Sequence, residues 1–508
     1  MSESKRIIEI SGESWLSGIS VHPYLPVGGM FQKATNFDPF QKVGIYIPSK
    51  TPSEVGSGAT IAQNIEAMIG YSASTGTVAH IIAFANSSKV YDINAANNSV
   101  SDVSSNISGM TTVRGAAKYK GSAVYASDDN VYANVIPLQA SQTTILSGIN
   151  TAPHVMKVAP DRNLYVTNGS SVARITSVTG TSGNQSTYLT FETGVVTRGL
   201  DDDGTHLVIV GDTNSVSPSS VLERNRCFVA FWNMKSQDLT RIWDFEDSSV
   251  GGVACVEDEV LVFGSSGTWT CSVGSRPRLL QPGIDNTSLF GAVPASGAVT
   301  KVGGIALWGV ATSSGASEGA GSYVRGYGRR SPHTKKVLFT AYSLPASDVA
   351  NGDTIRGLFM GSSTSATSVP LWISTNATKL YVYSVASTEI STAIIAGIDF
   401  RQPYEFSFAK VVLSEKLSSG QSVDLKITTD EGNNTVLQDT KDGGNPFSFT
   451  QVGGKKSHVF YPTPIAQSAS SIAVFEDLSD IQIVNKGASI RRIEIWGKPI
   501  RSDQNVYK

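Results

Sequence analysis

The chain has 508 residues, and its 40 lysines and arginines almost balance its 42 aspartates and glutamates. Only 16% of the residues are charged, which argues against the basic surface of a nucleic-acid-binding protein or of a protein that binds acidic membranes. The 48 glycines, together with many serines, threonines, valines and asparagines, favour short strands and tight turns over helices. We therefore expect an all-β protein.

The cysteines and the apolar runs restrict the class of protein further. Cys227, Cys255 and Cys271 lack the close paired spacing of a zinc site, so we interpret them as small core residues. The first ten residues contain no apolar stretch after their charges, and no run of about 18 apolar residues occurs in the chain. We expect neither a secretory leader nor a membrane span.

Residues 1–70 predict an extended N-terminal arm, because aromatic and turn residues mix there without steady alternation. Its aromatic side chains must pack either on the body of the same chain or on a neighbouring subunit. Within the arm, residues 60–70 have apolar residues at helical spacing, including Ile61, Ile65 and Met68, with Thr60 as a cap. The sequence therefore predicts one short helix at the end of the arm.

A loose repeat begins near residue 77, and its unit is three or four short apolar strands separated by turns. The central strands of six units lie 40 to 53 residues apart, near Ala83, Val124, Leu164, Val208, Leu261 and Ala306. A period of about 40 to 50 residues is typical of the blades of a β-propeller. A seventh unit is predicted in 336–385, so we assign residues 71–400 to a propeller of six or seven blades.

Two later regions differ from the repeat. Residues 309–336 are rich in glycine and serine and end in a basic cluster, so we expect a flexible or partner-contacting loop. Residues 401–508 contain longer strands with period-two alternation. They predict a β-sandwich or strands that close the ring, with an appended sheet.

The search for catalytic chemistry finds no motif. The six histidines are isolated, and no P-loop, dinucleotide fingerprint or G-x-S-x-G elbow occurs. Asp201, Asp202 and Asp203 could bind calcium, but a solvated hairpin tip is the simpler interpretation. The segment 265–271 has only a vague likeness to the turn of sialidase blades and lacks its aspartate. We predict no enzyme, and no catalytic, cofactor-binding or metal-binding residues.

Four stretches resemble the β-propeller nozzle, or hub, proteins of bacteriophage tails. They are NFDPFQKVGIYIPSKTP (36–52), VLVFGSSGTWTCSVGSRPRLLQPG (260–283), NTSLFGAVPASGAVTKVGGIALWGV (286–310) with SYVRGYG (322–328), and SIRRIEIWGKPI (489–500). The resemblance implies a structural protein of the virion tail, assembled in the host cytoplasm below the portal and connector. It implies a homo-oligomeric ring, with six copies, that forms part of the DNA exit channel and anchors fibres or spikes.

If the resemblance holds, the arm and the basic loop are the expected contacts with partners. DNA would meet the chain only in transit, and no membrane is involved. The predicted partner-contact residues are Trp15, Phe31, Phe37, Phe40, Arg329 and Arg330. The alternative is a carbohydrate- or receptor-binding propeller, for which Trp232, Trp243 and Trp372 are candidate aromatic contacts. A glycoside hydrolase is a third hypothesis, and it requires two converging carboxylates.

Overall fold

The chain divides into two compact β units. In this computed structural model one unit comprises Met1–Thr51, Arg325–Ser343 and Val385–Lys508, and the other comprises Pro52–Val324 and Leu344–Ser384. The structure describes residues 4–11, 31–34, 36–39, 45–55, 60–72, 79–107, 110–150, 153–213, 226–282, 294–312, 321–329, 335–344, 354–361, 370–388, 390–418, 420–429, 434–442, 457–460 and 474–499. Within these ranges the one helix is the short 3-10 turn η1 (Ser104–Asn106), and all other regular elements are strands.

The repeat folds into four-stranded sheets, of which the described strands form seven. The first four sheets contain β4 (Ile65–Ser72), β5 (Ala79–Ala85), β6 (Val90–Asn94) and β7 (Ser99–Asp102); β8 (Val113–Tyr119), β9 (Ser122–Ser127), β10 (Asn130–Val135) and β11 (Gln142–Ser147); β12 (Met156–Val158), β13 (Leu164–Asn168), β14 (Ser171–Ile175) and β15 (Gln185–Thr190); and β16 (Val196–Asp202), β17 (Leu207–Asp212), β18 (Arg226–Trp232) and β19 (Arg241–Glu246).

The remaining three sheets follow the same order, with one exception at the last strand. They contain β20 (Val250–Val256), β21 (Glu259–Gly264), β22 (Gly267–Ser272) and β23 (Ser275–Pro282); β24 (Val299–Val302), β25 (Ile305–Thr312), β26 (Gly321–Gly328) and β27 (Val337–Ser343); and β28 (Ile355–Met360), β29 (Leu371–Thr375), β30 (Leu380–Thr388) and β3 (Lys50–Glu54). In the last sheet the fourth strand therefore comes from the N-terminal part of the chain.

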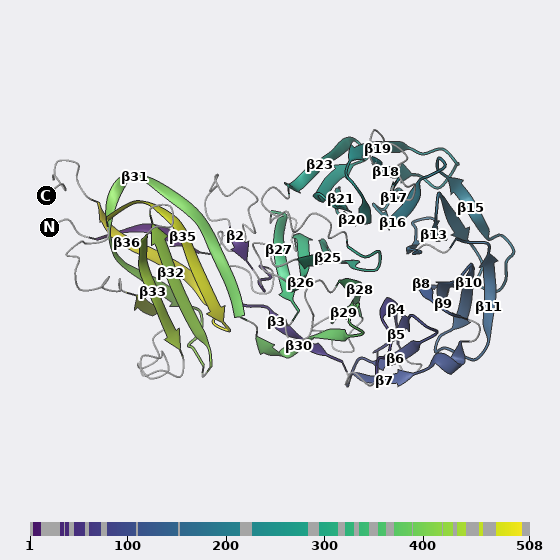
Figure 1. Cartoon of the computed structure of the whole chain (residues 1–508), viewed down its shortest axis with the longest axis horizontal. Helices are drawn as coiled ribbons and strands as arrows, with labels where there is room; N and C mark the ends of the chain where they lie inside the picture. Colours follow the sequence, from purple (N-terminus) through teal and green to yellow (C-terminus); the bar gives the residue numbers. More distant parts are fainter. Residues whose placement is uncertain are drawn as a thin grey trace. The chain divides into compact units, whose positions relative to one another are not determined.

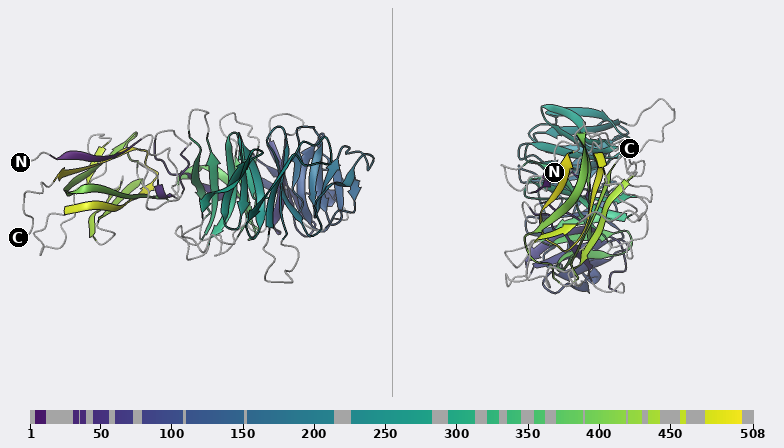
Figure 2. Two further views of the ribbon diagram at one scale, coloured as in Figure 1. Left: turned by 90° about the horizontal axis from the view of Figure 1, so that it is seen from above. Right: turned by 90° about the vertical axis from the view of Figure 1, so that its left-hand side faces the viewer.

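The sheets form a closed ring, which makes this fold a β-propeller. The first strands of successive sheets, β4, β8, β12, β16, β20, β24 and β28, are neighbours around the ring, and β28 is in turn a neighbour of β4 (Figure 1). Seen from the side, the sheets stand face to face (Figure 2). Each small sheet buries its two apolar faces against its neighbours, because it could not bury them alone.

The predicted repeat is confirmed in its six central strands. Ala83, Val124, Leu164, Val208, Leu261 and Ala306 each lie in the second strand of a successive sheet. The prediction for the seventh unit is wrong in its first strand, because KVLFTAYSL forms β27 of the preceding sheet. The first strand of this sheet is β28 and its fourth strand is β3, and Val55 next to β3 donates its amide hydrogen to Leu380 O at 2.8 Å. This pairing closes the ring with two distant parts of the chain.

The helix predicted over 60–70 is also wrong. Ile65–Ser72 is strand β4, whose backbone pairs with β5, and residues 60–64 are irregular. Ile65, Met68, Ile69 and Tyr71 are buried on its two faces. The pairing with β5 and the burial on both sides outweigh a short helical pattern rich in β-branched residues, which favour strands.

The loop predicted over 309–336 is partly regular structure. Residues 321–328 form β26, in which Arg325 is buried. Arg329 follows this strand and is partly buried, whereas Arg330 lies outside the described residues. Six of the eight residues in β26 are Tyr, Val or Gly, and the burial of this strand explains why the glycine-rich segment is extended.

The other unit is built on one eight-stranded sheet with the order β1-β36-β31-β35-β32-β33, to which β2 and β34 add by pairing with β31. Its strands are β1 (Lys5–Ile10), β2 (Phe31–Ala34), β31 (Ile390–Leu413), β32 (Ser422–Thr429), β33 (Asn434–Asp442), β34 (Ser457–Phe460), β35 (Val474–Lys486) and β36 (Ile490–Pro499). The described part of 401–508 forms strands, as predicted, while residues 443–456 and 461–473 lie outside the described residues. The long strand β31 begins before residue 401.

Strand β31 gives this sheet a sandwich-like form. Its first part, Ile390–Asp399, pairs with β35, and its last part, Tyr404–Leu413, pairs with β36. Both parts contribute to one apolar core, together with residues of β32, β35, β36, β1 and β2. The two ends of the chain meet in this sheet, since β1 pairs with β36.

Gly115 should be essential for the close packing of the ring. A Cβ atom at this position would lie 1.7 Å from the backbone oxygen of His154, which lies just before strand β12 of the neighbouring sheet. We expect Gly115→Ala to lower the free energy of unfolding by about 2–3 kcal/mol, measured by urea denaturation. Gly180→Ala is the matched control, because nothing lies within 4 Å of its Cβ position. Equal effects of the two substitutions would contradict the argument.

Candidate functional site

The first strands of the sheets contact one another around the ring, and we call them the inner strands. Five of them carry a β-bulge one or two residues after the strand begins. The register shifts of β4, β8, β16, β20 and β28 place Glu66, Arg114, Arg198, Gly251 and Arg356 at the bulges. The parallel bridge between Gly297 and Gly357 indicates that neighbouring inner strands run in the same direction. The bulged residues therefore lie at one end of the ring, which we call the axial face. A bulge re-aims its side chain, and bulges are common at functional sites.

A glycine follows each of the three bulged arginines. Close approach between neighbouring sheets explains Gly115 and Gly199, since a Cβ at Gly199 would lie 3.0 Å from Gly252 Cα, whereas a Cβ at Gly357 would lie 2.8 Å from Ser374 Oγ of its own sheet. These contacts leave no room for a side chain. In each Arg-Gly pair, the arginine places a charged group on the axial face, and the glycine that follows lies at a close packing contact.

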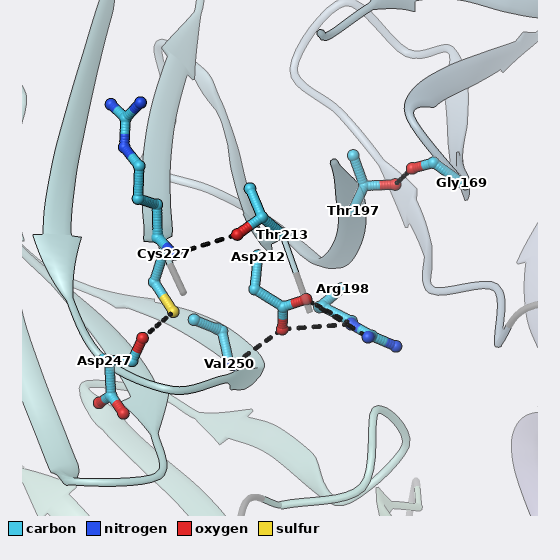
Figure 3. A network of polar contacts seen from close by, with 9 residues as sticks. Gly169, Thr197, Arg198, Asp212, Thr213, Cys227, Asp247 and Val250 are labelled. Carbon is cyan, nitrogen blue, oxygen red and sulfur yellow. Dashed lines mark hydrogen bonds and ion pairs between the residues drawn. The ribbon is translucent and has the colours of Figure 1, made fainter. Parts of the chain in front are cut away.

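Arg198 and Asp212 form the best-defined polar contact on the axial face (Figure 3). Asp212 is fully buried and accepts a hydrogen bond from Val250 N at 3.1 Å. Arg198 Nε and Nη2 approach its carboxylate at 3.3 Å. The contact joins β16 and β17 to the start of β20, so this pair holds two neighbouring sheets together.

A pocket of about 250 Å³ lies beside this ion pair. Residues before or at the start of four inner strands line it, among them Pro153, Arg198, Ser249, Pro294 and Ser296, together with Asp212. Arg198 and Asp212 are its charged side chains, and the two serines add hydroxyl groups. The pocket therefore offers hydrogen-bond donors and acceptors at the axial face.

Arg114, Arg356 and Glu66 occupy the bulges of three consecutive inner strands, β8, β28 and β4. Burial raises the pKa of Glu66, while Arg356, a hydrogen bond from Asn86 and Arg114 act in the opposite direction. The guanidinium groups of both arginines have no hydrogen-bond or ion-pair partner among the described residues, and their Nε atoms are buried. Two positive charges thus stand near one carboxylate without direct contact.

A second charged cluster joins four inner strands. Asp201 of β16 binds Lys157 of β12 and Lys301 of β24, each at 2.7 Å, and accepts the amide hydrogen of Cys255 in β20 at 2.6 Å. Asp202 binds Lys157 at 2.8 Å. Burial lowers the pKa of Lys157, but the two carboxylates outweigh burial and raise it. We call this group the Asp201 cluster.

The calcium hypothesis for Asp201, Asp202 and Asp203 is not supported by this arrangement. Two lysines neutralise the first two carboxylates, and Asp203 accepts hydrogen bonds from the backbone of Thr205 and His206. Only the last part of the acidic run is a hairpin tip, since Gly204 has a positive φ of 86° there. Among the described residues, no group of three or more His, Cys, Asp or Glu side chains could hold a metal ion.

His154 links two sheets through its backbone and its ring. Its amide donates to Arg114 O at 2.9 Å, while Nε2 lies 2.8 Å from Asn150 O and Nδ1 contacts Thr167 O. Burial lowers the pKa of His154; the two carbonyl groups oppose this and Arg114 adds to it. The imidazole is therefore a structural connector that favours its neutral form.

The aromatic residues of the arm lie in different environments. Phe31 and Phe37 are buried in the core of their own unit, where they contact Tyr46 edge-on or tilted. They are therefore not available as partner contacts, because their own chain already covers them. Trp15 and Phe40 lie outside the described residues. Of the predicted contact residues, Arg329 alone is described and partly exposed.

The tryptophans proposed for sugar binding are mostly inaccessible. Trp232 and Trp372 are fully buried. Trp243 is partly exposed, but the guanidinium of Arg241 lies 4.0 Å from its ring centre, and its Nε1 donates to Ser272 O. The buried position predicted for Cys227, Cys255 and Cys271 is confirmed, and burial raises the pKa of the Cys271 thiol to about 12.

The bulged arginines were not identified from the sequence, although a signal exists. Each occurs in a tripeptide of a β-branched residue, Arg and Gly, at Val113–Gly115, Thr197–Gly199 and Ile355–Gly357. These tripeptides recur at the start of the first strand of their repeat units.

In the described part of the chain, no helix is long and apolar enough to cross a membrane.

Comparisons with known proteins give similarity in fold only. No family model matches the chain, and no curated protein matches it. Among solved structures, the WD40 beta propeller domain of Doa1 is 9% identical, with 67% of this chain and 97% of that chain covered and a TM-score of 0.44. BBS1N, in complex with ARL6DN, is 12% identical, with coverage of 66% and 98% and a TM-score of 0.42. The computationally designed Ika8 protein is 12% identical, with coverage of 65% and 99% and a TM-score of 0.41.

The Asp201 cluster should contribute strongly to stability. In Asp201→Asn, Lys157 and Lys301 lose their shared counter-charge in a largely buried place. We expect the free energy of unfolding to fall by about 2–3 kcal/mol, since both lysines are partly exposed. Asp202→Asn is the control, because its side chain is more exposed and makes one ion pair, and it should cost less than about 1 kcal/mol. Urea denaturation of both variants measures the difference.

His154 should make stability depend on pH below neutrality. Its pKa in the folded protein lies below the ordinary value of 6.5, so the unfolded chain takes up a proton first as the pH falls. The stability that neutral His154 contributes is complete above pH 6.5 and declines below it. We expect His154→Gln to have a flatter stability profile between pH 7 and about pH 5. Parallel profiles of the two proteins throughout this range would exclude His154 as the cause.

Proposed function

We propose that the chain is a structural component of a bacteriophage tail, a nozzle or hub subunit that assembles into a ring of copies, six by resemblance. The organisation of the chain carries the proposal. The propeller is inserted into a second β unit, whose sheet contains both the first and the last described strands, β1 and β36. By sheet membership, the backbone enters the propeller at β3 and leaves it after β30, so two connections join the propeller to the eight-stranded sheet. Two backbone connections suit a part that transmits load better than a single flexible linker does.

The segments with the phage-tail resemblance support this role through their structural positions. Residues 260–282 form the hairpins β21 to β23 of one propeller sheet. Residues 490–499 form β36, which pairs with β1 and β31. In the first segment, Tyr46 exchanges backbone hydrogen bonds with Ile490 and donates or accepts a side-chain hydrogen bond with Ser391. All three segments thus serve the framework of the chain.

The proposed position in the tail includes contact with DNA only in transit. Adjacent sheets of the propeller are in direct backbone contact, since Leu358 N donates to Gly297 O of the neighbouring sheet at 2.8 Å. The Asp201 cluster joins further inner strands. DNA would therefore run through a channel enclosed by several copies, next to connector and fibre proteins in the virion. The near-neutral charge suits a wall along which DNA slides.

Native mass spectrometry of the purified full-length protein tests the ring. We expect a closed homo-oligomer, with six copies as the leading stoichiometry, because heterologous contacts close into rings. A glycan array on the same preparation tests the receptor-binding alternative. A monomer at tens of micromolar that binds a glycan saturably would replace the tail proposal with that alternative.

Arg329 is the described residue that best tests the predicted contacts between copies. It is partly exposed after β26, so we expect Arg329→Ser to weaken ring formation about tenfold in concentration dependence without unfolding the chain. Lys416→Ser is the matched control, because Lys416 is an exposed cation of the same unit. An unchanged oligomer distribution in Arg329→Ser would remove this residue from the interface.

A further inference from the structure

Three polar groups that line the axial pocket have no hydrogen bond to the described part of the chain. Arg198 uses Nε and Nη2 on the carboxylate of Asp212, at 3.3 to 3.4 Å. No described residue accepts a hydrogen bond from its Nη1, and Figure 3 shows a terminal nitrogen on the side away from Asp212. The hydroxyl groups of Ser249 and Ser296 are likewise unused by the described residues.

The guanidinium of Arg198 is held in place along one edge. Asp212 is fully buried, and Val250 N donates to its carboxylate at 3.1 Å, so the carboxylate is fixed. The side chain of Arg198 is 32% exposed, which places its guanidinium between this carboxylate and the solvent. Because a guanidinium is planar, fixing one edge also fixes the direction of the remaining N–H donors. Donors that are already oriented lose little entropy when a ligand binds.

Most of the remaining pocket wall is apolar. Pro153, Val196, Val250 and Pro294 line it beside the three polar groups. Apolar walls with a few fixed polar groups are typical of pockets that bind small molecules. The volume of about 250 Å³ is large enough for one ring that carries a short polar substituent.

The charges of the lining favour a neutral ligand. Arg198 and Asp212 are the charged side chains of the lining, and their charges cancel. An anion at Nη1 would be repelled by the buried carboxylate of Asp212, and a cation would be repelled by Arg198. A carbonyl oxygen accepts from Nη1 without adding a charge, and an amide N–H donates to a serine hydroxyl. A primary carboxamide supplies both groups.

We propose that the axial pocket binds a small neutral molecule that carries a primary carboxamide on an apolar ring. The carbonyl oxygen accepts from Arg198 Nη1, and the amide nitrogen donates to the hydroxyl of Ser249 or Ser296. The ring packs against the prolines and valines of the wall. This site is independent of the proposed role in a phage tail.

The test is a saturation-transfer NMR titration of the full-length protein with benzamide and, separately, with benzoate, which has the same shape and a negative charge. We expect saturable binding of benzamide with a dissociation constant of about 1 mM, and binding of benzoate that is about fivefold weaker or more. Arg198→Lys should weaken benzamide binding about tenfold, because lysine keeps a cation beside Asp212 but removes the oriented planar donor. Ser296→Ala should weaken it about threefold.

Ser99→Ala is the matched control, because Ser99 is an exposed serine of β7 that does not line the pocket. Its affinity for benzamide should equal that of the unaltered protein. The absence of saturable benzamide binding would overturn the proposal, and so would benzoate binding of equal or greater strength or an equal loss in Ser99→Ala. Thermal unfolding identifies an Arg198→Lys variant that does not fold. Ser296→Ala then decides, since the Ser296 hydroxyl makes no hydrogen bond to the described residues.

Discussion

The close approach of the inner strands at the centre of the ring is the constraint on which the structure depends. At Gly115 and Gly199 neighbouring sheets come within distances that exclude a Cβ atom, and a Cβ at Gly357 would lie 2.8 Å from Ser374 Oγ of its own sheet. The bulges immediately before these glycines then turn Arg114, Arg198 and Arg356 onto one face. Packing at the axis and charge on the axial face are therefore consequences of the same Arg-Gly pairs.

The described charged residues of the inner strands form two different arrangements, the Asp201 cluster and the arginines of the axial face. The Asp201 cluster pairs each carboxylate with lysine and joins four strands, so its charges serve cohesion. On the axial face Asp212 satisfies Arg198, while Arg114 and Arg356 keep unused donors. A buried donor that has no partner is unfavourable, because the interior of the protein does not replace the hydrogen bonds lost from water.

The ring and the second β unit are both closed by parts of the chain that are distant in sequence. Strand β3 completes the sheet of β28, β29 and β30, and β1 pairs with β36 in the other unit. Long-range pairing of this kind lowers the freedom of the termini and removes sheet edges. It also explains why Phe31 and Phe37 are buried in their own chain, since their segment is part of a sheet core.

The sequence by itself determined the all-β class, the propeller repeat and the burial of the cysteines, because strand length, turn residues and repeat spacing are local properties. Ala83, Val124 and Leu164 lie in equivalent strands for this reason. Tertiary structure alone decided that Ile65–Ser72 is a strand, that β3 replaces KVLFTAYSL in the last sheet, and that Asp201 meets Lys157 and Lys301. Each of these depends on a partner far along the chain, and local propensity contains no information about that partner.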